Sequence, residues 1–455
     1  MNRPATQHKR AAYPAYKPSG MNWVGDIPEH WEIHRLKHIA SVQFSSVDKH
    51  TLEGEDPVRL CNYVDVYYND FIAAGIEFMS ASATQSEIAR FQLCRGDVLV
   101  TKDSESWDDI AVPSYVAEKL DGVLCGYHLA HIRPHPRKLL GEYLFRAFRS
   151  RGINDQFRVA ANGITRFGLG KYWLDNGLFP VPSLDEQHSI ASFLDRETSQ
   201  IDELISKKQR QIELLQEKRS ALISHVVTKG LDPDVKMKDS GVEWLGEIPE
   251  HWGVIRFKFL LDEPLQYGAN ESAEYDEAAW PRYVRITDIN ENGNLREETF
   301  KSLPEDIARP YLLRDGDLLL ARSGATVGKT FLYLKSWGRA AYAGYLIRAR
   351  VEHEYMLPAF CSYFCRSSNY WDWLKSSFIQ ATIQNVSAER YANMVVPRPP
   401  IDEQQAIMAF LDRETSRIDE LIEKVNKSIE LLREYRTALI SAAVTGKIDV
   451  REEVA

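Results

Sequence analysis

The stretch GMNWVGDIPEHW at residues 20–31 occurs again, 221 residues later, as GVEWLGEIPEHW at residues 241–252. Eight of these twelve positions are identical. A second block, LDEQHSIASFLDRETSQIDELI at residues 184–205, recurs at residues 401–422 as IDEQQAIMAFLDRETSRIDELI, with sixteen of twenty-two positions identical. Repetition at a fixed distance defines the architecture before any single motif does. The chain is therefore a tandem duplication.

Between the two shared blocks the copies diverge, and only fragments can be paired. Residues 96–99 match residues 316–319, and Gly126-Tyr127 is paired with Gly344-Tyr345. A duplicated frame with divergent contents predicts that the middle of each copy carries specificity. Neutral drift in a tolerant surface region is the alternative interpretation.

The two divergent segments are residues 32–180 and 253–397, and short β-like runs alternate in them with Gly, Pro and Asn turns. The expected strands are 97–100 and 317–320, and the expected helices are 142–150 and 357–367. An α+β domain is therefore predicted in each copy. Residues 230–240, which include Pro233, predict a linker between the halves.

The second shared block has apolar residues at helical spacing, with polar residues on the opposite face. The predicted seam residues are Ile201, Ile205, Ile212, Leu215 and Leu222 in the first copy, and Ile418, Ile422, Val425, Ile429, Leu432 and Leu439 in the second. Ser183 and Glu186 have the spacing of a capping box. Ser199 and Ser416 mark a second possible start, so each block is expected to form a short helix followed by a long one.

Two equivalent seams in one chain favour an intramolecular antiparallel pair of helices over a homodimer. A helix over residues 199–227 would rise roughly 43 Å. This length is comparable to one turn of B-DNA, about 34–36 Å. The helices are therefore expected to act as a spacer between the two variable domains.

The composition bounds the class of protein. The chain has 455 residues, of which 44% are hydrophobic and 27% charged, as in folded water-soluble proteins of two or three domains. No apolar run suggests a signal peptide or a membrane span, so a cytoplasmic location is expected. The five cysteines are scattered, and reduced thiols are a better interpretation than disulfides or a metal pair at Cys361 and Cys365.

The net charge of −9 weighs against a freestanding nucleic-acid binder, which usually carries a basic excess. A subunit that docks to basic partners need not supply the whole electrostatic attraction itself. We therefore expect weak DNA binding by the isolated chain.

Several motifs resemble catalytic sites but depart from them. Residues 324–330, GATVGKT, have three residues between the glycines where a P-loop has four, and the first copy lacks the pattern, so a DNA-contacting loop is favoured over nucleotide binding. His30 and His251 lie in matching Pro-Glu-His-Trp segments, for which packing or capping is favoured over metal binding. No catalytic centre and no metal site is predicted.

Each divergent segment offers polar loops that mix basic, amide, hydroxyl and aromatic groups, as major-groove readout requires. The candidate DNA-contacting residues are Lys102, Asp103, Ser104, Tyr127, His128, Thr165 and Arg166 in the first copy, and Arg322, Ser323, Thr326, Lys329, Tyr342, Tyr345, Gln384 and Asn385 in the second. The same residue types also suit any exposed polar loop.

The duplicated pattern resembles the specificity subunit of type I restriction-modification systems. It consists of the Trp-x-Gly-x-Ile-Pro-x-His-Trp entry, a Gly-Asp strand, and then residues 182–187 and 399–404 leading into the long helices. The resemblance covers almost the whole chain. One departure is that the first copy lacks the Arg-Ser-Gly loop of the second, so equivalent base contacts are not assumed.

The resemblance implies a non-catalytic subunit that reads an asymmetric bipartite site on double-stranded DNA. It implies a first target recognition domain with an N-terminal extension at 1–180, a helical spacer at 181–230, a linker and second recognition domain at 231–397, and a second helical spacer at 398–455. Two methylation subunits with S-adenosylmethionine, and restriction subunits with ATP and magnesium, are the implied partners, and no cofactor is expected in this chain. A stand-alone or fused DNA-modification enzyme and a bivalent coiled-coil scaffold without DNA binding are the alternatives.

Overall fold

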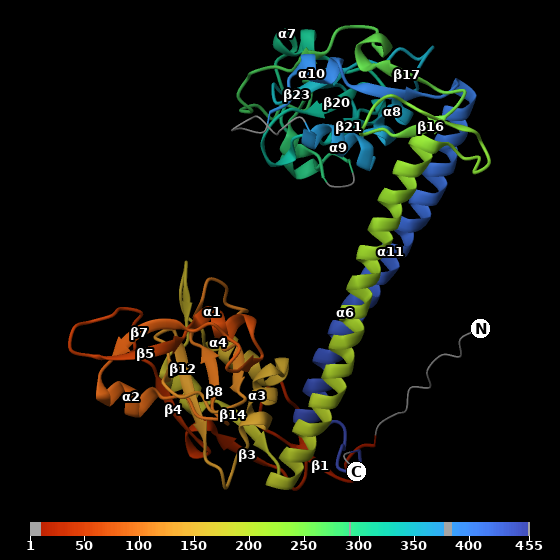
Figure 1. The fold of residues 1–455 in the computed structure, drawn as a ribbon. Helices are drawn as coiled ribbons and strands as arrows, with labels where there is room; N and C mark the ends of the chain where they lie inside the picture. Colours follow the sequence, from red (N-terminus) through yellow and green to blue (C-terminus); the bar gives the residue numbers. More distant parts are fainter. Residues whose placement is uncertain (1–10, 291–292, 377–384, 454–455) are drawn as a thin grey trace. The chain divides into compact units, whose positions relative to one another are not determined.

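The computed structural model describes residues 11–290, 293–376 and 385–453. The chain divides into two compact units: the first comprises Met1–Lys208 together with Lys427–Ala455, and the second comprises Gln209–Asn426. Each unit holds one α+β domain and parts of two long helices, as Figure 1 shows. The predicted α+β class and the internal duplication are thereby confirmed.

The domain of the first unit is built on a mixed five-stranded sheet in the order β4-β12-β8-β10-β6, flanked by a three-stranded sheet β11-β5-β7. Its strands are β1 (Tyr16–Pro18), β2 (Asp26–Pro28), β3 (Glu32–Arg35), β4 (Ala40–Phe44), β5 (Asp56–Cys61), β6 (Phe71–Ile72), β7 (Met79–Ala83), β8 (Val98–Thr101), β9 (Asp103–Ser104), β10 (Pro113–Val116), β11 (Val123–Cys125), β12 (Leu129–Pro134), β13 (Phe167–Gly168) and β14 (Leu178–Val181). Its short helices are α1 (Tyr63–Tyr68), α2 (Gln85–Phe91), α3 (Gly141–Arg149), α4 (Arg151–Ala160) and α5 (Lys171–Asn176).

The domain of the second unit has a four-stranded antiparallel sheet, β18-β23-β20-β21, and a parallel pair, β19-β22. Its strands are β15 (Met237–Asp239), β16 (Glu247–Pro249), β17 (Gly253–Arg256), β18 (Gln266–Tyr267), β19 (Arg282–Val284), β20 (Leu318–Ala321), β21 (Thr330–Leu332), β22 (Ala340–Tyr342), β23 (Leu346–Ala349) and β24 (Val395–Arg398). Its short helices are α7 (Glu305–Ala308), α8 (Pro358–Phe364), α9 (Ser368–Ser376) and α10 (Ala388–Ala392).

The central strand of each sheet is buried on both faces, which explains why its sequence is continuously apolar. In β8, Val98 and Val100 belong to one hydrophobic cluster while Leu99 belongs to another. In β20, Leu318 and Leu319 likewise face different clusters. Because successive side chains of a strand point to opposite faces, an unbroken apolar run suits a strand covered on both sides. The predicted strands at 97–100 and 317–320 correspond to these two elements.

Each long helix is continuous, which corrects the expectation of a short helix followed by a long one. Helix α6 runs over Leu184–Lys229 and α11 over Ile401–Val444. The hydroxyl of Thr415 donates a 2.7 Å hydrogen bond to the Leu411 carbonyl one turn earlier, so this residue is accommodated inside the helix. The apolar seam and the helical ladder therefore outweigh the local capping signal at Ser416.

The helices run antiparallel within each unit. In the first unit, Arg196 donates to the Glu453 carbonyl at 2.9 Å, and Asp202, further along α6, pairs at 3.0 Å with the earlier residue Arg436 of α11. In the second unit, Arg219 of α6 lies 3.4 Å from Asp419 of α11. All eleven predicted seam residues are buried or half-buried.

The repeated Pro-Glu-His-Trp and Asp-Glu-Gln motifs meet at the start of each long helix. In the first unit the Glu186 carboxylate accepts hydrogen bonds at 3.0 Å from both the Trp31 indole and the His30 ring. In the second unit Glu403 accepts at 2.8 Å from Trp252 and at 2.5 Å from His251. The histidines therefore anchor the helix to the domain, which agrees with the packing role favoured for them.

The glutamine that follows each of these glutamates is also buried and satisfied. The side-chain oxygens of Gln187 and Gln404 each accept a backbone N–H at 2.8 Å, from Leu140 and Leu357 respectively. Their amide groups each donate at 2.9 Å to the carbonyl of a proline that precedes the helix. A buried amide whose donors and acceptor are all paired fixes the helix entry, so the shared motifs are structural.

The stretch expected as a linker is partly ordered into a hairpin. Strand β15 pairs antiparallel with β16, as β1 pairs with β2 in the first unit. The division into two compact units also falls inside the long helices, whereas the boundaries drawn from the sequence follow chain order.

Candidate nucleic-acid interface

A tight turn ending in Gly-Asp leads into the central strand of each domain. Gly96 and Gly316 have φ angles of 97° and 85°, a region that glycine adopts without strain. The carboxylate of Asp97 accepts the Cys94 N–H at 2.8 Å, and that of Asp317 accepts the Arg314 N–H at 2.7 Å. The shared Gly-Asp pair therefore stabilises the turn that precedes the central strand.

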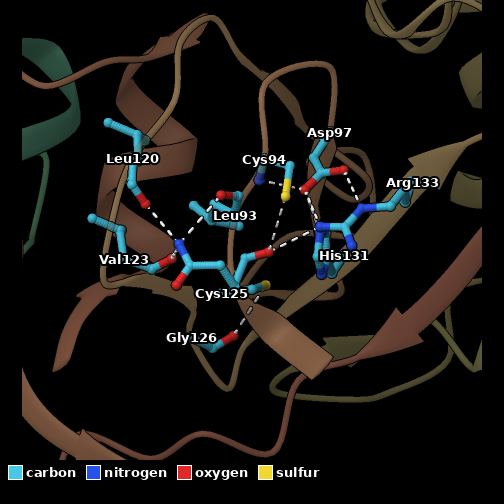
Figure 2. A network of polar contacts seen from close by, with 10 residues as sticks. Leu93, Cys94, Asp97, Leu120, Val123, Cys125, Gly126, His131 and Arg133 are labelled. Atoms are coloured by element: carbon cyan, nitrogen blue, oxygen red, sulfur yellow. Dashed lines mark hydrogen bonds and ion pairs between the residues drawn. The ribbon is translucent and has the colours of Figure 1, made fainter. Parts of the chain in front are cut away.

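Each of these aspartates is held by an arginine that lies in the neighbouring strand, as Arg133 does in β12, or directly after it, as Arg350 does after β23. Figure 2 shows Asp97 accepting two 2.8 Å hydrogen bonds from Arg133 and one of 2.7 Å from His131. In the second unit, Arg350 donates from Nε and Nη2 to Asp317, both at 2.8 Å. A bidentate pair of this kind is directional as well as strong, so it locks the register of the two strands.

The electrostatics of these pairs follow from burial and from the arginines. Burial alone would raise the pKa of Asp97, but the hydrogen bonds from Arg133 and His131 outweigh it and hold the pKa below its ordinary value. The hydrogen bond to Asp317 raises the pKa of Arg350, against the effect of burial. Asp97 is therefore a charged acceptor at neutral pH.

The central strand of each domain ends in a cation that lies over an aromatic ring. Strand β8 leads into Lys102, whose Nζ is 5.1 Å from the centroid of the Phe44 ring. Strand β20 leads into Arg322, whose guanidinium carbon is 4.7 Å from the centroid of the Tyr267 ring. Such distances are typical of a cation–π contact.

The strand registers show that the two contacts are equivalent. Phe44 pairs with Ala130 of β12, and Ala130 pairs with Val100 of β8. Tyr267 pairs with Ile347 of β23, and Ile347 pairs with Leu320 of β20. The aromatic side chain therefore occupies the same sheet position in both domains, and the duplicated frame presents a cation at the same place.

In the first unit this cation belongs to a polar cluster, which we call the first cluster: Lys102, Asp103, Tyr127, His128 and Arg166. Asp103 accepts from His128 Nδ1 at 2.8 Å and from Arg166 at 2.6 Å. The Lys102 Nζ also lies 4.4 Å from the Tyr127 ring centroid. Burial lowers the pKa of Lys102, while neighbouring Asp103 opposes this shift. Five of the seven predicted residues of this copy are thus brought together.

In the second unit the cation is surrounded differently, in what we call the second cluster: Tyr267, Arg322, Ser323, Tyr345 and Asn385. The Arg322 backbone N–H donates to the Tyr345 carbonyl at 3.1 Å, and Ser323 forms a β-bridge with Asn385. The Arg322 Nε is buried and has no hydrogen-bond partner within the described part of the chain. Tyr345 and Asn385 are exposed.

The alignment of Gly126-Tyr127 with Gly344-Tyr345 is wrong by one residue. Leu129 pairs with Thr101 in the first domain and Leu346 pairs with Ala321 in the second. His128, just before Leu129, is therefore the structural counterpart of Tyr345. Two identical residues gave the wrong alignment because structural equivalence here depends on which residues pair across the strands. Sequence identity carries no information on that pairing.

The remaining predicted residues lie outside the two clusters. Tyr342 is fully buried and its hydroxyl donates to the Gln266 carbonyl at 3.2 Å, so it is a core residue and we correct its assignment as a DNA contact. Ser104 is buried in β9, where its hydroxyl accepts a backbone N–H. Thr165 is exposed beside Arg166, and Gln384 lies outside the described residues.

The near-P-loop segment forms a short 3-10 turn at Gly324–Thr326. Thr326 is half-buried, and its carbonyl accepts the Lys329 N–H at 3.0 Å. Lys329 faces a separate polar cavity of about 210 Å³, which Arg219 and Arg366 also line. The basic residue of this motif is therefore not part of the second cluster.

The sequence patterns did not identify two residues of the site, Phe44 and Tyr267. Both follow a glutamine and an apolar residue, as Val42-Gln-Phe44 and Leu265-Gln-Tyr267. This shared apolar-Gln-aromatic triplet, placed shortly after the repeated entry motif, is the signal that could have identified them.

Neither a metal centre nor a membrane segment is present in the described residues. No group of three or more His, Cys, Asp or Glu side chains there is arranged to hold a metal ion. No described helix combines the length and apolar character needed to cross a bilayer. Cys361 and Cys365 are buried, and the hydrogen bond between them, with burial, raises the pKa of the Cys365 thiol.

The fold and the two clusters define a duplicated protein with two α+β domains, each in a unit that also holds part of an antiparallel helix pair. The family model for the type I restriction modification DNA specificity domain matches residues 28–214 and 269–431. The type I restriction enzyme MjaVIII specificity subunit of Methanocaldococcus jannaschii is 25% identical over 93% of this chain and 94% of its own length. The chain belongs to the family of type I restriction-modification specificity subunits, which confirms the resemblance.

Solved structures share the fold. A chain from a structure on complex assembly and conformational transition of the type I R-M system aligns with a TM-score of 0.71 at 17% identity, covering 92% of this chain and 99% of that chain. The HsdS subunit from Thermoanaerobacter tengcongensis aligns with a TM-score of 0.52 at 17% identity, covering 92% and 98% respectively.

Proposed function

We propose that this chain reads an asymmetric bipartite site on double-stranded DNA, with one recognition domain per half-site. The observation that carries the proposal is the cation–aromatic pair found at the same sheet position in both domains but with unlike neighbours. Lys102 lies beside Asp103, whereas Arg322 lies beside Ser323 and the bridge to Asn385. Two domains with the same sheet framework but different polar side chains around the cation are suited to recognise two different base sequences.

The chemistry of each cluster suits base edges and phosphates. Arginine can bind guanine through two parallel hydrogen bonds, and asparagine can bind adenine in the same way. The exposed amide of Asn385 and the guanidinium of Arg322 offer both kinds of group in the second cluster. In the first cluster, Asp103 holds Arg166 and His128 in fixed orientations, which favours positioned contacts over diffuse attraction.

We further propose that the chain acts within a complex with two methylation subunits and with restriction subunits. The net charge of −9 supports this because phosphate neutralisation then comes in part from the partners. The long helices supply extended polar faces available for docking. In this proposal S-adenosylmethionine, ATP and magnesium bind to the partners.

The test is a map of methylated bases in cells that carry the complete system and one variant at a time. Arg322→Ala should weaken or relax recognition of one half-site, and Lys102→Ala should affect the other. Arg314→Ala is the matched control in the second domain, because this arginine is 70% exposed and lies outside the cluster. Identical methylation maps for Arg322→Ala, Lys102→Ala and the unaltered chain would refute the proposal.

An exchange of residues 253–397 with the matching segment of another subunit should replace one half of the methylated motif and leave the other unchanged. Retention of the whole motif would favour the scaffold alternative. S-adenosylmethionine binding by the purified chain would favour the enzyme alternative.

A further inference from the structure

The second unit contains an open pocket beside the anchored glutamate of its long helix. The pocket has a volume of about 300 Å³ and is lined by His251, Glu403, Pro249, Leu231, Ala406 and Ile407. Its walls are largely apolar, and Glu403, Asp232, His251 and Lys229 bring charged or polar groups to the edge, an arrangement typical of a small ligand site. All of the lining residues belong to the second unit, and Pro249, His251, Glu403, Ala406 and Ile407 lie in the two repeated blocks.

The first unit fills the corresponding place with its own tyrosine. The Tyr13 hydroxyl donates a 2.6 Å hydrogen bond to Glu186, the counterpart of Glu403. The Tyr13 ring centroid lies 5.7 Å from that of His30 and 5.8 Å from that of Trp31. Tyr13 itself is 4% exposed, so the aromatic ring closes this site completely.

Among the described residues of the second unit, no tyrosine donates to Glu403. The hairpin registers align β1 with β15, which places Asp234 at the position of Tyr13, and Asp234 is exposed. The consequence is visible at the carboxylate: the side chain of Glu186 is 4% exposed, whereas that of Glu403 is 36% exposed. Glu403 keeps the indole and imidazole donors but lacks the phenol donor that Glu186 has.

We propose that this pocket of the second unit binds a tyrosine side chain supplied by another protein segment. The copy of the site in the first unit supplies the template, because Tyr13 enters it from the segment that leads into β1. That segment is itself held by a backbone hydrogen bond, in which the Asp449 N–H donates to the Ala11 carbonyl at 2.8 Å. A tyrosine side chain presented by a partner therefore matches the pocket, while residues 234–236 of the chain already take the place of the segment that carries Tyr13.

The carboxylate determines which rings are accepted. A phenol hydroxyl can donate to Glu403, whereas a phenylalanine ring leaves that acceptor unused. A phosphorylated tyrosine brings further negative charge against two carboxylates, Glu403 and Asp232, of which Lys229 can offset only one. The site should therefore select tyrosine over phenylalanine and reject phosphotyrosine. This inference is independent of which DNA the recognition domains read.

The experiment is a titration of the full chain, followed by the methyl resonance of Ile407 in the pocket wall. The probes are p-cresol, which is the tyrosine side chain alone, toluene, p-cresyl phosphate, and a pentapeptide with the AAYPA sequence of residues 11–15. We expect p-cresol and the peptide to shift the Ile407 resonance, p-cresol to bind about tenfold tighter than toluene, and p-cresyl phosphate to have no effect.

The variant Asp234→Tyr should fill the pocket from within the chain and abolish both titrations. Asp234→Ala is the matched control, because it removes the same exposed carboxylate without adding a ring and should leave binding intact. No shift of Ile407 with p-cresol, or an unchanged titration in Asp234→Tyr, would overturn the site. Binding of p-cresol without binding of the peptide would overturn the assignment to a protein segment.

Discussion

Replacement of Arg350 by methionine tests whether the buried aspartate–arginine pair holds the central strand of the second domain. Arg350 and Asp317 have side chains that are 8% and 1% exposed, and they share two 2.8 Å hydrogen bonds. Methionine keeps much of the side-chain volume but removes the charge. Within the described part of the chain, the Asp317 carboxylate would then keep only the hydrogen bond from the Arg314 backbone N–H. A buried carboxylate that has lost its cation is the costly outcome.

The expected loss is about 3–5 kcal/mol of unfolding free energy for the second unit, the range found when one partner of a buried pair is removed. For a unit of this size that corresponds to a fall in melting temperature of roughly 6–20 °C. The first unit offers an internal comparison. Arg133 is 44% exposed and Asp97 would still keep its His131 hydrogen bond, so Arg133→Met should cost about 1–2 kcal/mol.

The assay is calorimetry of the full chain together with hydrogen exchange, which reports the two units separately. Arg350→Met should lose amide protection in β20 and β23 while the first unit keeps its own. Adding Asp317→Leu to this variant should recover part of the lost stability because the unpaired charge is then gone. A loss below about 1 kcal/mol for Arg350→Met, or no recovery in the double variant, would refute the reasoning.

The same geometry leads to two further expectations. Gly328→Ala should destabilise the second unit by about 2–4 kcal/mol, because the φ of Gly328 is 83° and the new Cβ would lie 2.0 Å from Leu374. Gly324→Ala should cost only about 1–2 kcal/mol, because Gly324 has a φ of 77° but open space around it. Equal losses of unfolding free energy in urea would contradict this. The pKa of Asp97 is held below 3.8, so the stabilisation of the fold by its carboxylate is fully present above that pH and is lost as the pH falls through the folded-state pKa. The difference in unfolding free energy between the unaltered chain and Arg133→Met should therefore shrink on acidification. A difference that is constant with pH would argue against the ion pair.

Sequence patterns predict the structure best where the signal is periodic or duplicated. The repeat, the α+β class and the long helices follow from patterns that many residues share, so an error at one residue does not change the conclusion. The helix start at Ser416 failed for the opposite reason: a capping preference is worth only about 1 kcal/mol, and the continuous apolar seam outweighs it.

The sequence identified some of the site residues correctly and missed or misassigned others. Residue type identified Lys102, Arg322 and Asn385 as polar groups on loops, but the same reasoning chose Tyr342, which is buried in the core. Phe44 and Tyr267 were not found because a cross-strand neighbour is defined by register, and register depends on how strands far apart in the chain pair.

What the sequence by itself determined is the duplicated frame: two entry motifs, two helical seams and two divergent domains, all of which are local or periodic properties of the chain. What only the tertiary structure decided is which side chains meet. It placed the glutamate of each long helix against the tryptophan and histidine of each entry motif, it paired each buried aspartate with an arginine, and it left one glutamate covered by a tyrosine and the other open. Some of these contacts join residues about 150 positions apart in the chain, and others join residues on neighbouring strands of a sheet. Their geometry arises only when the whole core packs.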